Sequence, residues 1–286
     1  MSERDDVHEA GAVQALPTDL RLHRRTTFDA DAERYARTRP SYPSALFDAL
    51  AEAAGLREGS RVLEVAPGTG QATVSMAERG WRVTAVELGA HMAALARRTV
   101  AEVPSADVEV VVSPFEDWPL PAEPFDAVVC ATAWHWLDPA LRARKAAAAL
   151  RPGGVLAVVW SSHVAGGSQE FFDAATSCWE QFGQRDSGGG TRFTLTPEAE
   201  VDPATAELER SDAFAEVSHR GFPLEVEYTT ERYLDLISTY SQVAVLAPEA
   251  REGLLDGLRE LADGRFGGRV THRYLFQLVL ARTRAG

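Results

Sequence analysis

Short apolar runs alternate with stretches of helical periodicity through the middle of the chain. The apolar runs, each of strand length, are residues 61–65, 82–86, 108–112, 125–130 and 155–160. The helical stretches between them are residues 71–79, 90–100 and a segment that Asp138-Pro139 begins and Leu150 ends. Strands that alternate with helices favour a Rossmann-like α/β fold, with a doubly wound and mostly parallel sheet.

The pattern changes after Trp160. Residues 163–213 are polar and interrupted by glycines, whereas residues 216–228 and 274–281 have strand character. Residues 230–262 show the spacing of two helices. We therefore expect a seven-stranded sheet with helical insertions before and after its sixth strand.

The N-terminal region divides at about residue 25. Residues 1–25 have little periodicity, and we expect them to be disordered or loosely attached. The first half of residues 28–43 predicts a short helix, and Ser44 is placed to cap the next helix, which Gly55 ends. The predicted domain covers residues 26–286, with a core of about 44–162, 214–228 and 270–284 and a lid of about 26–43, 163–213 and 229–269.

Composition excludes several classes of protein. The chain has 286 residues and a formal net charge of −13, and it has no basic stripe with interleaved aromatic residues. We therefore expect no nucleic-acid partner. No run approaches the length of a membrane span, and residues 1–25 lack the apolar centre of a signal peptide. Two cysteines without metal-ligand spacing predict no metal site and a reducing, cytoplasmic location.

The most informative motif follows the first strand. Residues 64–70 read E-x-A-x-G-x-G, with Glu64 on the strand and Gly68 and Gly70 in the turn before a helix. A strand, a glycine turn and a helix bring backbone N–H groups to a ligand. A dinucleotide site needs a third glycine where this chain has Thr73. Because Ala66 has a Cβ atom, we expect its backbone to avoid positive φ.

A carboxylate ends the second strand. Glu87 lies where an acidic side chain can accept both ribose hydroxyls of an adenosine ligand. NAD sites use the same device, and a solvated acid at a strand end is the plain alternative. Leu88 and Met92 are candidates to flank an adenine, although Met92 also suits the core.

The chain resembles class I S-adenosylmethionine-dependent methyltransferases. The E-x-A-x-G-x-G motif, residues 28–43, residues 131–139 and Arg151-Pro152-Gly153-Gly154 carry this resemblance, which extends to a bacterial small-molecule group related to trans-aconitate-type enzymes. It covers about residues 28–160 well and 214–282 more loosely. Two positions depart from the family pattern: Ala66 replaces the usual first glycine, and Ser113-Pro114 replaces the usual acid after the third strand.

The resemblance implies a set of contacts with S-adenosylmethionine. The 66–70 loop would meet the methionine moiety, the 113–116 loop would line the adenine, and Tyr35 would cover the site. The residues expected to contact the cofactor are Tyr35, Arg39, Glu64, Ala66, Pro67, Gly68, Gly70, Glu87, Leu88, Met92, Pro114, Phe115, Glu116, Ala131, Thr132 and Trp134. For several of them ordinary packing is the alternative, as in a proline-rich turn at 113–118 or a tryptophan buried in the core.

Ligands bind at the carboxyl ends of strands in open α/β sheets, so the loop after the fourth strand should face the reacting methyl group. His135 in that loop is the candidate general base, and a histidine that only shapes the pocket is the alternative. The residues expected near the acceptor are Tyr42, Trp136, His163, Phe171 and Tyr240. Arg39 and Tyr42 are placed to reach either the cofactor carboxylate or an acidic acceptor. Phe171 also suits a small core within the lid.

These expectations together predict an enzyme that methylates a small organic acceptor, with an oxygen atom as the favoured target. Two alternatives remain open. In the first, the chain is a cyclase or another non-methylating enzyme that binds the cofactor on the same fold. In the second, it is a non-catalytic protein with a degenerate cofactor site. The acceptor and the oligomeric state are not readable from the residues.

Overall fold

The computed structural model describes residues 32–182 and 195–284. Seven strands form one sheet in the order β3-β2-β1-β4-β5-β7-β6, which confirms the predicted α/β fold. The strands are β1 (Arg61–Val65), β2 (Arg82–Glu87), β3 (Asp107–Val112), β4 (Phe125–Ala131), β5 (Leu150–Val164), β6 (Phe214–Thr229) and β7 (Arg269–Thr283). The first five run parallel, and β7 lies antiparallel between β5 and β6.

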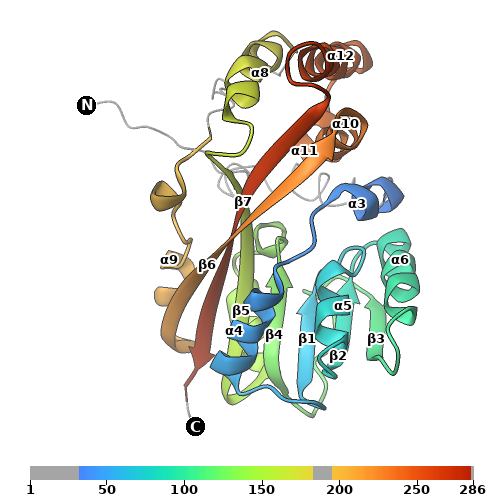
Figure 1. Cartoon of the computed structure of the whole chain (residues 1–286). Coiled ribbons are helices and arrows are strands. Elements are labelled where there is room, and N and C mark those ends of the chain that lie inside the picture. Colours follow the sequence, from blue (N-terminus) through green and yellow to red (C-terminus); the bar gives the residue numbers. More distant parts are fainter. Residues whose placement is uncertain (1–31, 183–194, 285–286) are drawn as a thin grey trace.

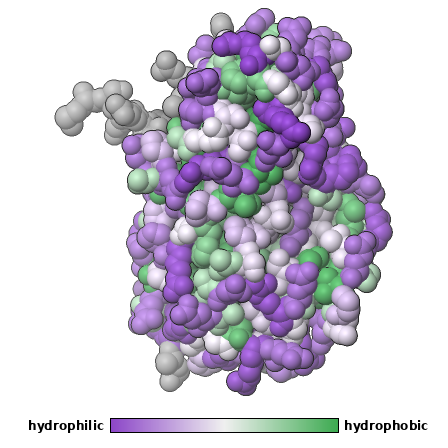
Figure 2. All heavy atoms as spheres, viewed as in Figure 1, coloured by the Kyte–Doolittle hydropathy of each residue, from purple (hydrophilic) through white to green (hydrophobic). Residues whose placement is uncertain are grey.

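Helices cover both faces of the sheet. The helices are α3 (Ala32–Thr38), α4 (Ser44–Ala54), α5 (Gln71–Ala77), α6 (Ala90–Ala101), α7 (Arg142–Ala149), α8 (Gln169–Phe182), α9 (Ala206–Glu209), α10 (Thr230–Ser238), α11 (Ser241–Ala244) and α12 (Pro248–Arg265), with short 3₁₀ turns at Trp134–Trp136 and Glu198–Glu200. Apolar residues of α4 and α5 pack against one face of the sheet, and those of α7 and α9 pack against the other. Hydrophilic residues cover most of the face shown in Figure 2.

Strands β5, β6 and β7 have 15–16 residues each, whereas β1 to β4 have 5–7. Figure 1 shows that β6 and β7 continue past the other strands to reach α8, α10 and α12. These helices have an aromatic core of their own, in which the ring of Phe171 lies edge-on to Phe172, Tyr233 and Phe266 at 5.3–5.4 Å. The long strands therefore carry the lid helices above the carboxyl ends of β1 and β4.

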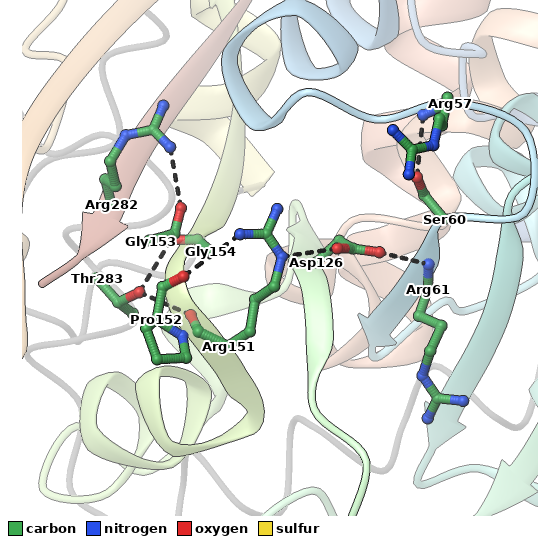
Figure 3. Close-up of polar contacts among 10 residues, drawn as sticks. All are labelled: Arg57, Ser60, Arg61, Asp126, Arg151, Pro152, Gly153, Gly154, Arg282 and Thr283. Atoms are coloured by element: carbon green, nitrogen blue, oxygen red, sulfur yellow. Dashed lines mark hydrogen bonds and ion pairs between the residues drawn. The ribbon is translucent and has the colours of Figure 1, made fainter. Parts of the chain in front are cut away.

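Polar contacts link neighbouring strands at the opposite end of the sheet, as Figure 3 shows. Asp126 accepts hydrogen bonds from the Arg61 backbone N–H at 2.9 Å and from Arg151 Nε at 2.7 Å. The Thr283 hydroxyl donates to the carbonyls of Arg151 and Gly154, at 3.0 and 3.2 Å. These bonds connect β1, β4, β5 and β7 where the parallel strands begin.

Three predicted details were wrong. The 230–262 region forms three helices, because the Thr239 hydroxyl bonds to the Leu236 carbonyl as α10 ends, and Pro248 starts a separate helix. The helix expected at Asp138 begins at Arg142, since the Asp138 side chain accepts the Ala140 N–H and forms a turn. Ser44 is the first residue of α4 after an N-cap at Pro43, and its hydroxyl accepts from Arg79 instead.

No helix in residues 32–182 and 195–284 is long and apolar enough to cross a membrane. The predicted N-terminal segment of residues 1–25 lies outside the described residues. The same is true of residues 26–31 and 183–194, which belong to two of the predicted lid segments.

Candidate functional site

Two non-glycine residues adopt left-handed backbone conformations at the carboxyl ends of the central strands. Ala66 follows β1 and Thr132 follows β4, and both have φ 55°. Their N–H groups continue the sheet, with bonds to the carbonyls of Val86 (2.9 Å) and Val159 (2.8 Å). The expectation that Ala66 avoids positive φ was therefore wrong, because these hydrogen bonds hold it there. Such strain costs of order 1–3 kcal/mol and clusters at functional sites.

The two glycines of the turn have different surroundings. A Cβ atom built on Gly68 (φ 59°) would meet nothing within 4 Å among the residues that the structure describes, so these residues leave space open beside the turn. A Cβ atom on Gly70 (φ 92°) would lie 3.2 Å from the Ala96 backbone. Gly70 therefore lets α6 pack against the start of α5, whereas Gly68 leaves room beside the loop. Pro67, directly before Gly68, is buried.

Glu87 holds the glycine turn in place. One oxygen of its carboxylate accepts the Gly68 N–H at 2.9 Å, and the other accepts the Gly89 N–H at 2.8 Å. The side chain is buried at the carboxyl end of β2. The acid predicted at this strand end thus lies beside the turn after β1 and orders its backbone.

Glu64 lies deeper on the same edge. Its side chain is 1% exposed, and the Thr73 hydroxyl donates to its Oε2 atom at 2.6 Å. Burial, together with the charge of Glu87, raises the pKa of Glu64 to about 8. Thr73 had entered the sequence argument only as the position of a missing glycine, so its contact with Glu64 was not foreseen.

The residues predicted for the adenine side come from β2, α6 and the loop after β3. Leu88 is half-buried and Met92 is buried. Phe115 is buried beneath the Lys145 ammonium, which lies 5.5 Å from its ring centroid. The Pro114 carbonyl accepts from the Asp117 N–H, and the Glu116 carboxylate accepts from the Asp138 N–H. One bond within the loop and one to the segment after β4 therefore fix it.

The loop after β4 joins the site to the N-terminal segment. The Tyr42 hydroxyl lies 3.0 Å from the Thr132 hydroxyl, and its ring packs 5.4 Å from Phe276 of β7. Burial raises the pKa of Tyr42 well above its usual range, so the phenol is neutral. Ala131, which ends β4, is buried.

Trp134 is held from two sides. Its indole N–H donates to Glu207, and the Arg142 guanidinium lies 5.3 Å from its ring centroid. Arg142 is 3% exposed, bonds the Trp134 carbonyl at 2.7 Å, and forms a bidentate pair with Glu207. This pair ties α9 to the loop after β4. Sequence reasoning missed it because no local pattern relates residues 65 positions apart.

His135 lies between two tryptophans. Its ring is 4.9 Å from that of Trp136 and stacks on that of Trp160 at 5.7 Å. Burial, and after it the charge of Arg142, lowers the pKa of His135 to about 3. Within the described ranges its Nδ1 atom has no hydrogen-bond partner. The imidazole is therefore neutral at physiological pH.

A cationic cluster lies between α3 and α10. The Arg39 guanidinium is 5.0 Å from the Tyr35 ring and 4.8 Å from the Tyr240 ring, and it donates to the side chain and the carbonyl of Thr239. Cation–π contacts and hydrogen bonds thus join the end of α3 to the end of α10. We call Tyr35, Arg39, Thr239 and Tyr240 the Arg39 cluster.

The other two predicted acceptor residues lie farther into the lid. His163 stacks on His272 with ring centroids 3.9 Å apart, and Phe172 lies edge-on to both rings. Phe171 is fully buried in the aromatic core of the lid. Tyr42, Trp136 and Tyr240, the last of which belongs to the Arg39 cluster, are therefore the predicted acceptor residues nearest the carboxyl ends of β1 and β4. No group of potential metal-ligating side chains occurs in residues 32–182 and 195–284.

Comparisons with known proteins agree with this geometry. Residues 63–158 match the methyltransferase domain family. An uncharacterised methyltransferase of Mycobacterium tuberculosis is 28% identical over 235 residues, which cover 82% of this chain and 85% of the relative.

Two solved structures share the fold. A candidate type II methyltransferase from Anaeromyxobacter dehalogenans has a TM-score of 0.59 and 24% identity, covering 87% of this chain and 99% of its own. Haemonchus contortus phosphoethanolamine N-methyltransferase 2, solved with S-adenosyl-L-methionine, has a TM-score of 0.50 and 17% identity, covering 95% of this chain and 61% of its own. Residues 63–158 therefore match a methyltransferase domain, and the chain shares its fold with solved methyltransferases.

Proposed function

We propose that S-adenosylmethionine binds along the carboxyl ends of β1, β2 and β4. Glu87 would receive the ribose hydroxyls, the turn from Ala66 to Gly70 would meet the methionine moiety, and the 113–116 loop would hold the adenine. The open space beside Gly68 and the strained backbone at Ala66 and Thr132 support this assignment. The remaining cofactor contacts are those that the resemblance implies.

The acceptor, in this proposal, is a small organic molecule that lies between the loop after β4 and the Arg39 cluster. This region offers a guanidinium, aromatic faces and the paired hydroxyls of Tyr42 and Thr132. A cation with neutral donors suits an acidic acceptor. The position of the Arg39 guanidinium, over the rings of Tyr35 and Tyr240, is the observation that carries this part of the proposal.

We favour an oxygen atom that is ionised before it binds. A phenol has a pKa of about 10, so proton transfer from it to His135, whose pKa is about 3, would be uphill by roughly 9 kcal/mol. A carboxylic acid, with a pKa near 4, is already ionised at neutral pH and needs no base. The reaction would then be an in-line attack of a carboxylate on the methyl group, with alignment supplied by the protein.

His135 tests that preference. In His135→Gln, which keeps a polar side chain of similar size, we expect kcat to fall less than about threefold and cofactor affinity to be retained. A general base contributes about 10²–10⁴-fold. A loss of that size in a folded variant would make His135 the base and favour a protonated acceptor.

The function itself is tested with S-adenosylmethionine and a panel of small carboxylic acids, phenols and amines. Mass spectrometry should find a methyl ester and an equal amount of S-adenosylhomocysteine, and alkaline hydrolysis should release methanol from the product. Methyl on nitrogen or carbon would overturn O-methylation. An isomerised product with unchanged cofactor would favour the non-methylating enzyme, and binding without any turnover would favour the non-catalytic protein.

A further inference from the structure

Glu64 is a buried acid to which the neighbouring residues of 32–182 and 195–284 bring no positive charge. It sits on a central strand, is 1% exposed, and receives a hydrogen bond from the Thr73 hydroxyl. Within the described ranges it forms no ion pair with a lysine, arginine or histidine. A buried carboxylate without a cationic partner is so costly that such groups usually stay protonated.

The titratable neighbours of Glu64 are one acid and one neutral phenol. Glu87, from β2, adds a like charge. Tyr42, from the segment before α4, is electrostatically coupled to Glu64 and is itself a neutral phenol. Burial and the charge of Glu87 together raise the pKa of Glu64 to about 8.

Glu87, on the neighbouring strand, has a different set of hydrogen-bond donors. Two backbone N–H groups donate to its carboxylate, one to each oxygen. Hydrogen bonds of this kind stabilise the charged form. Among the described residues, Glu64 instead receives one hydrogen bond, from the Thr73 hydroxyl. Its charged form therefore has less support than that of Glu87, and a cation would supply what is missing.

The missing cation can come from the cofactor. Glu64 lies two residues before Ala66, at the start of the turn that we assign to the methionine moiety. That moiety carries an ammonium group, and in S-adenosylmethionine a sulfonium as well. We propose that Glu64 is protonated in the protein without cofactor and releases its proton to solvent when the cationic amino-acid end of the cofactor binds. This inference rests on the cofactor site proposed above.

Proton release makes cofactor affinity depend on pH. Because the bound state holds fewer protons than the free state, affinity rises with pH until Glu64 ionises in the free protein as well, at about pH 8. The dissociation constant should fall by up to about tenfold per pH unit below that point, and level off at low pH where the bound form also becomes protonated.

The experiment is an isothermal titration with S-adenosylhomocysteine in pairs of buffers that differ in ionisation enthalpy. At about pH 7 we expect release of nearly one proton for each ligand bound, because a group of pKa about 8 is about nine-tenths protonated there. Methylthioadenosine, which keeps the nucleoside but lacks the amino-acid end, should bind without proton release. Glu64→Gln should bind S-adenosylhomocysteine without proton release, and its affinity should stay flat between about pH 5.5 and 7.5.

Each other outcome has a distinct meaning. Wild-type binding of S-adenosylhomocysteine without proton release would overturn the inference, as would proton release that persists in Glu64→Gln. Folded protein that does not bind this ligand at all would overturn the proposed cofactor site instead. If Glu64→Gln does not fold, a carbon-13 titration of the Glu64 carboxyl in the ligand-free protein replaces it. A pKa near 8 would support the inference, and one near the ordinary 4.3 would overturn it.

Discussion

The amino and carboxyl ends of the parallel strands treat acidic side chains in opposite ways. At the amino end, Asp126 has Arg151 and a backbone N–H as partners within the chain, in a partly exposed network (Figure 3). At the carboxyl end, Glu64 is buried with only a hydroxyl donor. The first arrangement is complete and contributes to stability. The second lacks a cation, which is the arrangement expected of a site that binds a charged ligand.

The backbone shows the same contrast. The left-handed residue in the turn at the amino end of β5 is Gly153 (φ 72°), which adopts that conformation without strain. At the carboxyl end, Ala66 and Thr132 adopt left-handed conformations that cost energy for residues with a Cβ atom. Ser105 (φ 59°), just before β3, shows that strain alone does not mark the functional end. The carboxyl end differs because its strained residues directly follow the two adjacent central strands, and one of them lies two residues after the buried Glu64.

The largest effect should come from adding a methyl group to the glycine turn. Gly70→Ala places a Cβ atom 3.2 Å from the Ala96 backbone at φ 92°, so we expect a loss of about 2–3 kcal/mol in the free energy of unfolding. Gly68→Ala is the matched control, because it adds similar backbone strain without a close contact. Urea unfolding of both variants measures the difference, and equal losses would show that Gly70 has no packing role.

The next effect concerns the lid above the carboxyl end. Burial, together with His163, lowers the pKa of fully buried His272, so the unfolded chain binds the proton more tightly. Stability is then present above the unfolded pKa of about 6.5 and is lost as pH falls below it. His272→Phe should remove a share of about 1–2 kcal/mol from the fall in stability between pH 7 and 5, while the buried His135 and His163, whose pKa values are also lowered, keep their own shares. Thermal or urea unfolding checks this, and the same substitution at exposed His219 should leave the slope unchanged.

Glu87→Ala tests the acid at the carboxyl end of β2. It removes one bond to the glycine turn, one to the Gly89 N–H and the proposed bonds to ribose, so affinity for S-adenosylhomocysteine should fall at least tenfold, or about 1.4 kcal/mol. Titration calorimetry gives the affinities. Asp126→Ala removes an acid from the other end and should leave them unchanged. Unaltered binding by Glu87→Ala would refute its assignment.

The smallest effect belongs to the amino end. Burial alone would raise the pKa of Asp126, but the bonds from Arg151 and the Arg61 N–H lower it. This stabilisation is present above the unfolded pKa of about 3.9 and is lost as pH falls through the lower, folded value. Asp126→Asn should therefore cost less than about 1 kcal/mol at neutral pH and flatten only the acid limb of a stability profile. A change of slope near neutral pH would contradict the assignment.

Hydrophobic periodicity predicted the sheet well, because each core strand is a compact apolar run between turn residues. Helix starts were harder to predict: the side chains of Asp138 and Ser44 bond to a nearby turn and to a distant arginine rather than cap a helix. The glycine turn and Glu64 could be predicted together, because one motif at residues 64–70 carries both. The Arg142–Glu207 pair and the stack of His163 on His272 could not be predicted, because they join segments far apart in sequence.

Binding of S-adenosylhomocysteine to the purified wild-type protein, with NAD as the control ligand, tests the central claim most directly. The account predicts saturable, one-to-one binding in the micromolar range for S-adenosylhomocysteine and none for NAD. Folded protein that gives no heat with S-adenosylhomocysteine would contradict it, because the buried acids at the carboxyl ends of β1 and β2 would then serve some purpose other than this cofactor.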